Sequence, residues 1–275
     1  MPDYARPQTL TDALRLMGRG RVSVLAGGTD LYPGAGAALA GAVVDLTGVP
    51  ELCGLQTGHG LRIGAATSWT AIAEADLPPA LRALQQAAWQ IGGRQIQNAG
   101  TIGGNLCNAS PAADGVPPLM ALGAKVELAS AQGTRRLALE AFLQGPRRTA
   151  LSPGEVVTAI LIPESGLQGR SAFVKLGARS HLVISIAMVA ARVVVQAGRV
   201  VDATVAVGAC SPVAVRLPAV EAALRGATVA EALDRVQAAD VTVALAPIDD
   251  VRATAAYRLA AATELVRRAV AGALA

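Results

Sequence analysis

The sequence predicts an α+β protein, in which helices pack on one face of an antiparallel sheet. Short apolar runs separated by glycine- and proline-rich turns fill the first 165 residues, as expected for short strands. From Ala172 onward, three strand-like runs are followed by Ala-rich helical patterns. Strands followed by helices are typical of this fold class. The composition changes at residues 163–169 (PESGLQG), where we expect a boundary between two parts of the chain.

The first part of the chain contains both helical and extended patterns. Residues 9–17 predict a helix with Thr9 as its N-cap, because the apolar residues that follow Thr9 share one helical face. Further helices are expected at residues 70–75 and 79–91, and strands at 22–25, 43–46, 61–63, 125–128, 134–137 and 156–162. A turn is expected at residues 48–50, and residues 117–122 fit either a helix or the start of a strand.

The second part has a simpler order. Strands are expected at residues 172–176, 183–195 and 200–207, with a hairpin turn at 196–199 between the last two. Helices are expected at residues 217–224, 229–236 and 252–274.

Composition excludes several classes of protein. The net charge of +4 comes mostly from scattered single arginines, so the clustered basic face of a nucleic-acid-binding protein is not expected. Three widely spaced cysteines form no CxxC pair, so we expect no metal site on the chain and a reducing compartment. The N-terminus lacks a signal-peptide pattern, and the most apolar window, residues 182–191, is too short to span a bilayer. We therefore expect a cytoplasmic protein.

Residues 91–114, IGGRQIQNAGTIGGNLCNASPAAD, show neither helical nor strand periodicity and predict a long polar loop. Glycine allows another molecule to approach the main chain, and exposed backbone N–H groups bind anions. The loop therefore suggests a phosphate-bearing ligand held by the backbone. A second glycine turn, LAGGTDL at residues 25–31, follows a strand. Alone it would usually be only a turn, but two such turns could clamp one extended ligand.

Other motifs point to no separate chemistry. The chain has no phosphate-binding GxxxxGK[ST] motif and no GxSxG elbow, and GAGAAL at residues 34–39 predicts only a connector. His59 is expected to be an exposed turn residue. His181 follows Lys175 and Arg179, a run that fits either a solvated strand end or positive charge near an electron-rich ligand. We expect no catalytic acid–base pair and no nucleophile.

Three segments, AGGTDL, GGRQIQNAGTIGGNLCNASPAAD and AFVKLGARS, resemble the FAD-binding medium subunit of molybdenum hydroxylases, the xanthine dehydrogenase / carbon monoxide dehydrogenase family. The resemblance extends over nearly the whole chain. It implies a two-lobed FAD-binding domain at residues 1–165, with an N-terminal lobe at about 1–55 and a larger lobe at about 56–165. A C-terminal domain at residues 170–275, with a three-stranded antiparallel sheet and helices, would follow.

The resemblance also implies a set of FAD-binding residues. One group would wrap the diphosphate and its flanks: Val24, Leu25, Ala26, Gly27, Gly28, Thr29, Asp30 and Leu31. A second group would hold the other side of the diphosphate: Thr101, Gly104 and Asn105. Ile91 would line the pocket, and Asp114 would bind the adenosine or ribityl part. Val157 and Lys175 would contact the flavin end. Residues 32–37 are smaller and less charged than in many relatives.

The function implied is that of an oxidoreductase subunit that carries FAD. It would take electrons from two [2Fe–2S] clusters in a small subunit, pass them to an external acceptor, and leave substrate oxidation to a large molybdopterin subunit. A dimer of such heterotrimers is expected. Two alternatives stay open: a stand-alone flavin reductase or oxidase, and a flavin-free nucleotide-binding scaffold.

Overall fold

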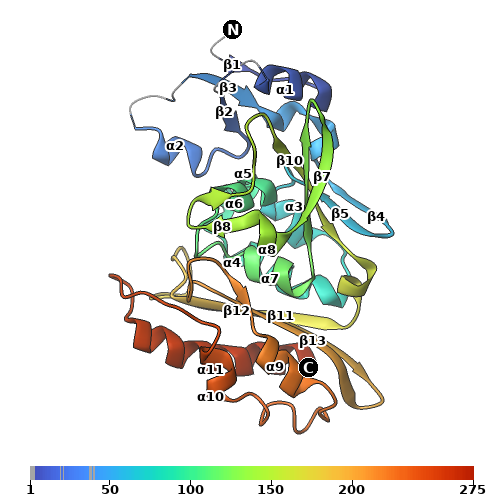
Figure 1. Cartoon of the computed structure of the whole chain (residues 1–275), viewed down its shortest axis with the longest axis vertical. Coiled ribbons are helices and arrows are strands. Elements are labelled where there is room, and N and C mark those ends of the chain that lie inside the picture. The colour runs from blue at the N-terminus through green and yellow to red at the C-terminus, as the bar shows by residue number, and fades with distance from the viewer. Residues whose placement is uncertain (1–3, 19, 21, 37–38, 40) are drawn as a thin grey trace.

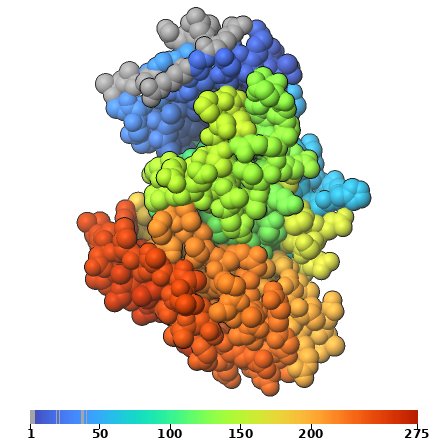
Figure 2. Space-filling view, viewed as in Figure 1, coloured from blue at the N-terminus to red at the C-terminus, as the bar shows by residue number. Residues whose placement is uncertain are grey.

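The computed structural model describes residues 4–18, 20, 22–36, 39 and 41–275. Three sheets follow one another along the molecule, from the N-terminal elements at one end to the C-terminal helices at the other (Figure 1). Figure 2 shows the same three tiers in contact, with the middle tier between the N-terminal and C-terminal ones. The connector expected at residues 34–39 includes residues 37 and 38, which lie outside the described residues.

The N-terminal tier is a parallel sheet in the order β1-β3-β2, formed by β1 (Tyr4–Ala5), β2 (Val22–Leu25) and β3 (Ala42–Asp45). The other elements of this tier are α1 (Leu10–Met17), α2 (Leu31–Gly34), η1 (Leu46–Gly48) and η2 (Pro50–Leu52). The hydroxyl of Thr9 caps α1 by accepting a hydrogen bond from the amide of Asp12 at 3.1 Å. The expected helix and its N-cap are therefore confirmed.

The middle tier is an antiparallel sheet in the order β4-β5-β10-β6-β7. Its strands are β4 (Leu55–Gly58), β5 (Gly60–Gly64), β6 (Lys125–Ser130), β7 (Gly133–Ala138) and β10 (Val156–Ile162). Helices α3 (Trp69–Glu74), η3 (Pro79–Leu81), α4 (Arg82–Gln90), α7 (Val116–Ala121) and α8 (Leu139–Phe142) belong to this tier, as does the ribbon of β8 (Leu143–Gly145) and β9 (Arg148–Thr149). Residues 117–122 thus lie almost entirely in a helix, and the strands expected at 125–128, 134–137 and 156–162 are confirmed.

The prediction of a long loop at residues 91–114 is wrong. Most of that segment is helical, in α5 (Arg94–Ala99) and α6 (Ile102–Asn108). The first turn of α6 is capped by Thr101, whose hydroxyl accepts from the amide of Gly104 at 3.1 Å. Ile102 and Leu106, four residues apart, are both fully buried. Tertiary burial of this pair outweighs the low helix propensity of two adjacent glycines.

The C-terminal tier is an antiparallel sheet of four strands rather than the expected three, in the order β11-β12-β13-β14. Its strands are β11 (Arg170–Leu176), β12 (Ala187–Gln196), β13 (Arg199–Gly208) and β14 (Val215–Arg216). The additional strand, β14, has only two residues, which is too short for an alternating pattern to reveal. The expected hairpin turn is confirmed, and Ala197 and Gly198 in it have φ of 48° and 73°.

The C-terminal tier also contains helices α9 (Pro218–Leu224), α10 (Ala238–Thr242) and α11 (Ala255–Leu274). The short helix η4 (Glu164–Leu167) precedes its first strand, β11. The prediction of a helix at residues 229–236 is wrong, because that segment forms turns. Arg192 of β12 is buried and donates to the carbonyl of Ala121 at 3.2 Å and to Asp202 at 2.6 Å. Since Ala121 ends α7, this arginine fixes the C-terminal sheet to the middle tier.

Candidate functional site

A cavity of about 760 Å³ lies between the N-terminal tier and the middle tier. Three stretches of chain supply most of its wall: residues 23–31 in and after β2, residues 96–108 around α6, and residues 151–157 at the start of β10. Most of the residues implied by the family resemblance line it: Val24, Ala26, Gly27, Gly28, Thr29, Asp30, Leu31, Ile91, Thr101, Gly104, Asn105 and Val157. Leu25 does not line it, because its side chain is buried on the other face of β2.

The first glycine turn rests directly on the backbone of the middle tier. A Cβ at Gly27 would lie 2.6 Å from the carbonyl carbon of Ala99 and 2.8 Å from Cα of Gly100. No side chain fits there. Gly28 has φ of +71°, a left-handed conformation that favours glycine. The glycine turn therefore packs directly against the backbone of Ala99 and Gly100, between α5 and α6.

The two glycine turns differ in what their amides do. The backbone N–H groups of Gly27 to Asp30 donate to no acceptor within the described part of the chain. In α6, the amides of Ile102 and Gly103 donate to Thr67 O at 3.1 Å and Ala65 O at 2.8 Å. The amide of Gly104 is bound to Thr101 Oγ1. The amides of residues 102–105 are therefore bound within the protein, whereas those of Gly27 to Asp30 have no acceptor in the described residues.

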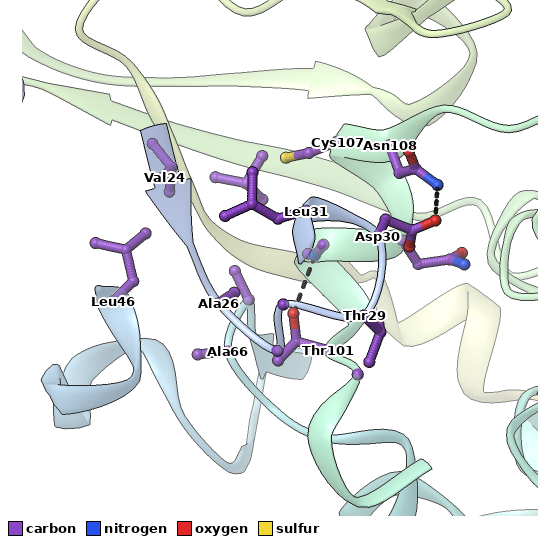
Figure 3. A pocket seen from close by; sticks show the side chains of 18 of the residues that line it. Val24, Ala26, Thr29, Asp30, Leu31, Leu46, Ala66, Thr101, Cys107 and Asn108 are labelled. Carbon is purple, nitrogen blue, oxygen red and sulfur yellow. Dashed lines mark hydrogen bonds between the residues drawn. The ribbon is translucent and has the colours of Figure 1, made fainter. Parts of the chain in front are cut away.

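A side-chain contact joins the two turns at one end of the cavity. Asn108 Nδ2, at the end of α6, donates to Asp30 Oδ1 at 2.7 Å (Figure 3). Arg147 donates to the side-chain oxygen of the same asparagine. Asp30 is therefore already hydrogen-bonded to protein, and this end of the cavity is polar.

The other end is apolar. Figure 3 shows Val24 and Leu46 on the side of the cavity away from Asp30 and Asn108. Leu46 belongs to a buried cluster with Leu52 and Val156, both of which also line the cavity. A flat apolar group would be desolvated at this end, and a polar chain would find partners at the other.

Glu155 is a cavity residue that sequence reasoning missed. Its Oε1 accepts from Arg135 Nε at 2.6 Å, and its Oε2 accepts from Arg135 Nη2 and the amide of Ser152, both at 2.7 Å. The hydrogen bonds from Arg135 lower the pKa of Glu155 to about 2, so it is ionised at neutral pH. A single glutamate before a strand gives no signal that could have identified it.

Asp114 and Lys175 do not line the cavity but bind one another. Lys175 Nζ lies 2.6 Å from Asp114 Oδ2, and both side chains are less than a tenth exposed. Ser185 Oγ donates to Asp114 Oδ1 at 2.5 Å, and Lys175 also donates to the carbonyl of Gln90 at 3.3 Å. Burial raises the pKa of Asp114, against the opposing effects of Lys175 and Ser185. Because Gln90 precedes the cavity residue Ile91, this pair lies next to the Ile91 side of the wall.

Two further findings concern the described residues as a whole. No three His, Cys, Asp or Glu side chains among them are grouped so that they could hold a metal ion. None of the helices they form has the length and apolarity needed to cross a membrane.

Comparison with known proteins gives matches along the chain. The family model of the FAD binding domain in molybdopterin dehydrogenase matches residues 1–165, and that of the CO dehydrogenase flavoprotein C-terminal domain matches residues 172–273. The carbon monoxide dehydrogenase medium chain of Afipia carboxidovorans is 35% identical, with 98% of this chain and 95% of that one covered. A nicotinate dehydrogenase FAD-subunit of Eubacterium barkeri is 35% identical over 67% of this chain and 66% of its own length.

The fold agrees with these sequence matches. A solved structure of reconstituted CO dehydrogenase from Oligotropha carboxidovorans superposes with a TM-score of 0.90 at 31% identity. The superposition covers 99% of this chain and 97% of that one.

Proposed function

The chain belongs to the FAD-binding medium subunits of the molybdenum hydroxylase family, and on that premise we propose that it is the electron-transfer subunit of a heterotrimeric dehydrogenase. Its partners would be a small subunit with two [2Fe–2S] clusters and a large molybdopterin subunit, arranged as a dimer of heterotrimers. Electrons would arrive from the clusters and leave to an external acceptor. The name "medium chain" of the Afipia carboxidovorans relative supports a complex with other subunits.

The single observation that carries this proposal is the glycine turn at Gly27 to Asp30, which lines the cavity and whose amides have no acceptor in the described part of the chain. A diphosphate needs such donors, because the cavity wall contains no lysine or arginine among the described residues. Asn105 also lines the cavity, and its side-chain oxygen is buried without a hydrogen-bond donor in the described structure. An apolar end and a polar end also suit a molecule with a ring and a hydroxyl-bearing chain. The residues present therefore fit FAD.

When bound, FAD supplies the reversible uptake and release of electrons. The amides of Gly27 to Asp30 would hold the diphosphate, with Thr101, Gly104 and Asn105 across the cavity. Val24, Ala26, Leu31, Ile91 and Val157 would exclude water from the bound dinucleotide, and Leu25 would support the turn from behind. Lys175 would lie near the flavin end, with its ammonium paired with Asp114 and donating to the carbonyl of Gln90 beside the cavity residue Ile91.

We also propose the division of the chain that the resemblance implies, with an FAD-binding domain at 1–165 in two lobes and a C-terminal domain at 170–275. The three separate sheets support this division. A cytoplasmic location is proposed as well. The three cysteines, none of them in a disulfide, favour it.

The proposal is tested by the visible spectrum of the purified chain after addition of FAD and removal of excess cofactor. We expect yellow flavin absorbance that stays with the protein. A colourless protein would contradict the proposal and favour the flavin-free scaffold. Co-purification of tagged chain from its native host should recover one larger and one smaller partner, and recovery of a yellow chain alone would favour the stand-alone reductase or oxidase.

Two adjacent glycines of α6 provide a matched pair of variants. Among the described residues outside its own helix backbone, a Cβ at Gly104 would meet only the hydroxyl of Thr101, at 2.9 Å. A Cβ at Gly103 would lie 2.7 Å from both Cβ and O of Ala65. Gly104→Val should therefore weaken FAD binding with a stability loss of about 1 kcal/mol, from the disturbed cap. Gly103→Val should lose about 1–3 kcal/mol by overpacking. FAD titration and thermal unfolding measure both, and unchanged FAD affinity in Gly104→Val would remove this turn from the site.

A further inference from the structure

Glu155 is one of only two charged residues among the described residues that line the cavity, and the other, Asp30, is bound to Asn108. Glu155 takes no part in the proposed diphosphate site at Gly27 to Asp30. Its side chain is 10% exposed and is fixed by the two-point contact with Arg135, so its position is set before any ligand arrives. A carboxylate held at a fixed position in the wall of a ligand cavity can contact the ligand, so the ligand should carry a group that complements it.

The carboxylate of Glu155 has room for one more hydrogen bond. An ionised carboxylate offers about four acceptor positions. Arg135 uses one at Oε1, and Arg135 and the amide of Ser152 use two at Oε2. One position remains, at Oε1, and because an ionised carboxylate can only accept, a ligand group placed there has to be a hydrogen-bond donor. A diphosphate has no donor at neutral pH and would be repelled, so Glu155 cannot serve that part of the ligand.

The surroundings of Glu155 select the part of the ligand that supplies the donor. The next residue along the chain, Val156, packs with Leu46 and Leu52 at the apolar end of the cavity. Asn105 and Asn108, which suit a hydroxyl-bearing chain, come from α6, and Asn108 lies at the other end, as Figure 3 shows. A purine ring fits the apolar end, and an adenosine carries donors in its exocyclic amine and its ribose hydroxyls.

We infer that Glu155 recognises the adenosine half of the bound dinucleotide by accepting a hydrogen bond from its adenine amine or a ribose hydroxyl. The inference rests on the proposed function. Glu155 is then a specificity-determining residue, which admits adenine dinucleotides and discriminates against ligands that present an acceptor or no group at this position.

Competitive displacement of bound FAD from the full-length chain tests the inference. ADP is compared with inosine diphosphate, which replaces the amine by a carbonyl, and with 2′-deoxy- and 3′-deoxy-ADP. For the unaltered chain, we expect at least one analogue to bind about tenfold or more weakly than ADP, as for a lost hydrogen bond to a charged group. The analogue that is penalised identifies whether the amine or a ribose hydroxyl is the donor.

Glu155→Ala should reduce that preference to within about twofold, and Glu155→Gln, a neutral acceptor, should give an intermediate ratio. Glu127→Gln is the matched control, because Glu127 is also paired with an arginine in the same sheet but does not line the cavity. A ratio of affinities does not change through a general loss of stability, and Glu155→Gln remains informative if Glu155→Ala folds poorly.

Two results would overturn the inference. Equal binding of all four nucleotides to the unaltered chain would do so, as would an undiminished preference in both Glu155 variants. In either case FAD uptake by the unaltered chain would leave the proposed function standing. A chain that takes up no FAD would overturn the proposed function and this inference together.

Discussion

Gly27→Val should weaken FAD binding on the order of 100-fold, because it separates the two glycine turns that form the cavity. A Cβ at Gly27 would lie 2.6 Å from the carbonyl carbon of Ala99 and 2.8 Å from Cα of Gly100, and both are backbone atoms. Backbone cannot rotate away as a side chain can, so the turn at residues 26–30 has to move. A displacement that costs about 3 kcal/mol of binding corresponds to a loss of affinity on the order of 100-fold.

FAD titration of the purified variant, followed by flavin absorbance, measures this loss. Gly58→Val is the matched control, since no heavy atom of the described residues, its chain neighbours apart, lies within 4 Å of a Cβ at Gly58. This glycine belongs to the edge strand β4, outside the cavity. The control should bind FAD with unchanged affinity. Retention of normal FAD affinity by Gly27→Val would show that the contact with Ala99 and Gly100 does not shape the site.

The parts of the fold that could be predicted from sequence are those with a local signal. Thr9 and the periodic residues after it fixed α1, and apolar runs identified most of β5, β6, β7 and β10. Helix α6 was missed because its stability comes from burial of Ile102 and Leu106 against other parts of the chain rather than from the propensity of the segment. Helix α5 was missed because its six residues include a single buried one, Gln97, and so show no apolar period. Strand β14 was missed because two residues contain no period.

In the candidate site, too, features with a local sequence signal could be predicted, and features that depend on contacts distant in sequence could not. The glycine turn at residues 27–30 could be identified because glycine at a strand end is a local signal for close backbone approach. The amide pattern could not, since the amides of Ile102 and Gly103 are bound to residues more than 30 positions earlier, Thr67 and Ala65. Glu155 gives no signal until Arg135 is placed beside it.

The pair formed by Asp114 and Lys175 is also a contact that only the fold creates, and it leads to the second large expected effect. Lys175→Met should lower the free energy of unfolding by about 3–5 kcal/mol, because it leaves the buried Asp114 charge without its partner. The double variant Lys175→Met/Asp114→Asn should recover much of that loss, since a neutral amide needs no counter-charge. Arg268→Met is the control: its ion pair with Glu264 is exposed, and its removal should change stability by no more than about 0.5 kcal/mol.

The pH dependence of Lys175→Met gives an independent check on the cause. Burial already raises the pKa of Asp114 in the folded protein, and removal of the lysine raises it further. A carboxyl whose folded pKa lies above its unfolded value is most favourable to folding when protonated, so the variant should lose stability as the pH rises toward the folded pKa. Its deficit relative to the unaltered chain should therefore shrink on acidification, as measured by denaturant unfolding across that range. A deficit that is the same at every pH, or a double variant as unstable as Lys175→Met, would show that lost packing of the lysine side chain, and not an unpaired charge, is responsible.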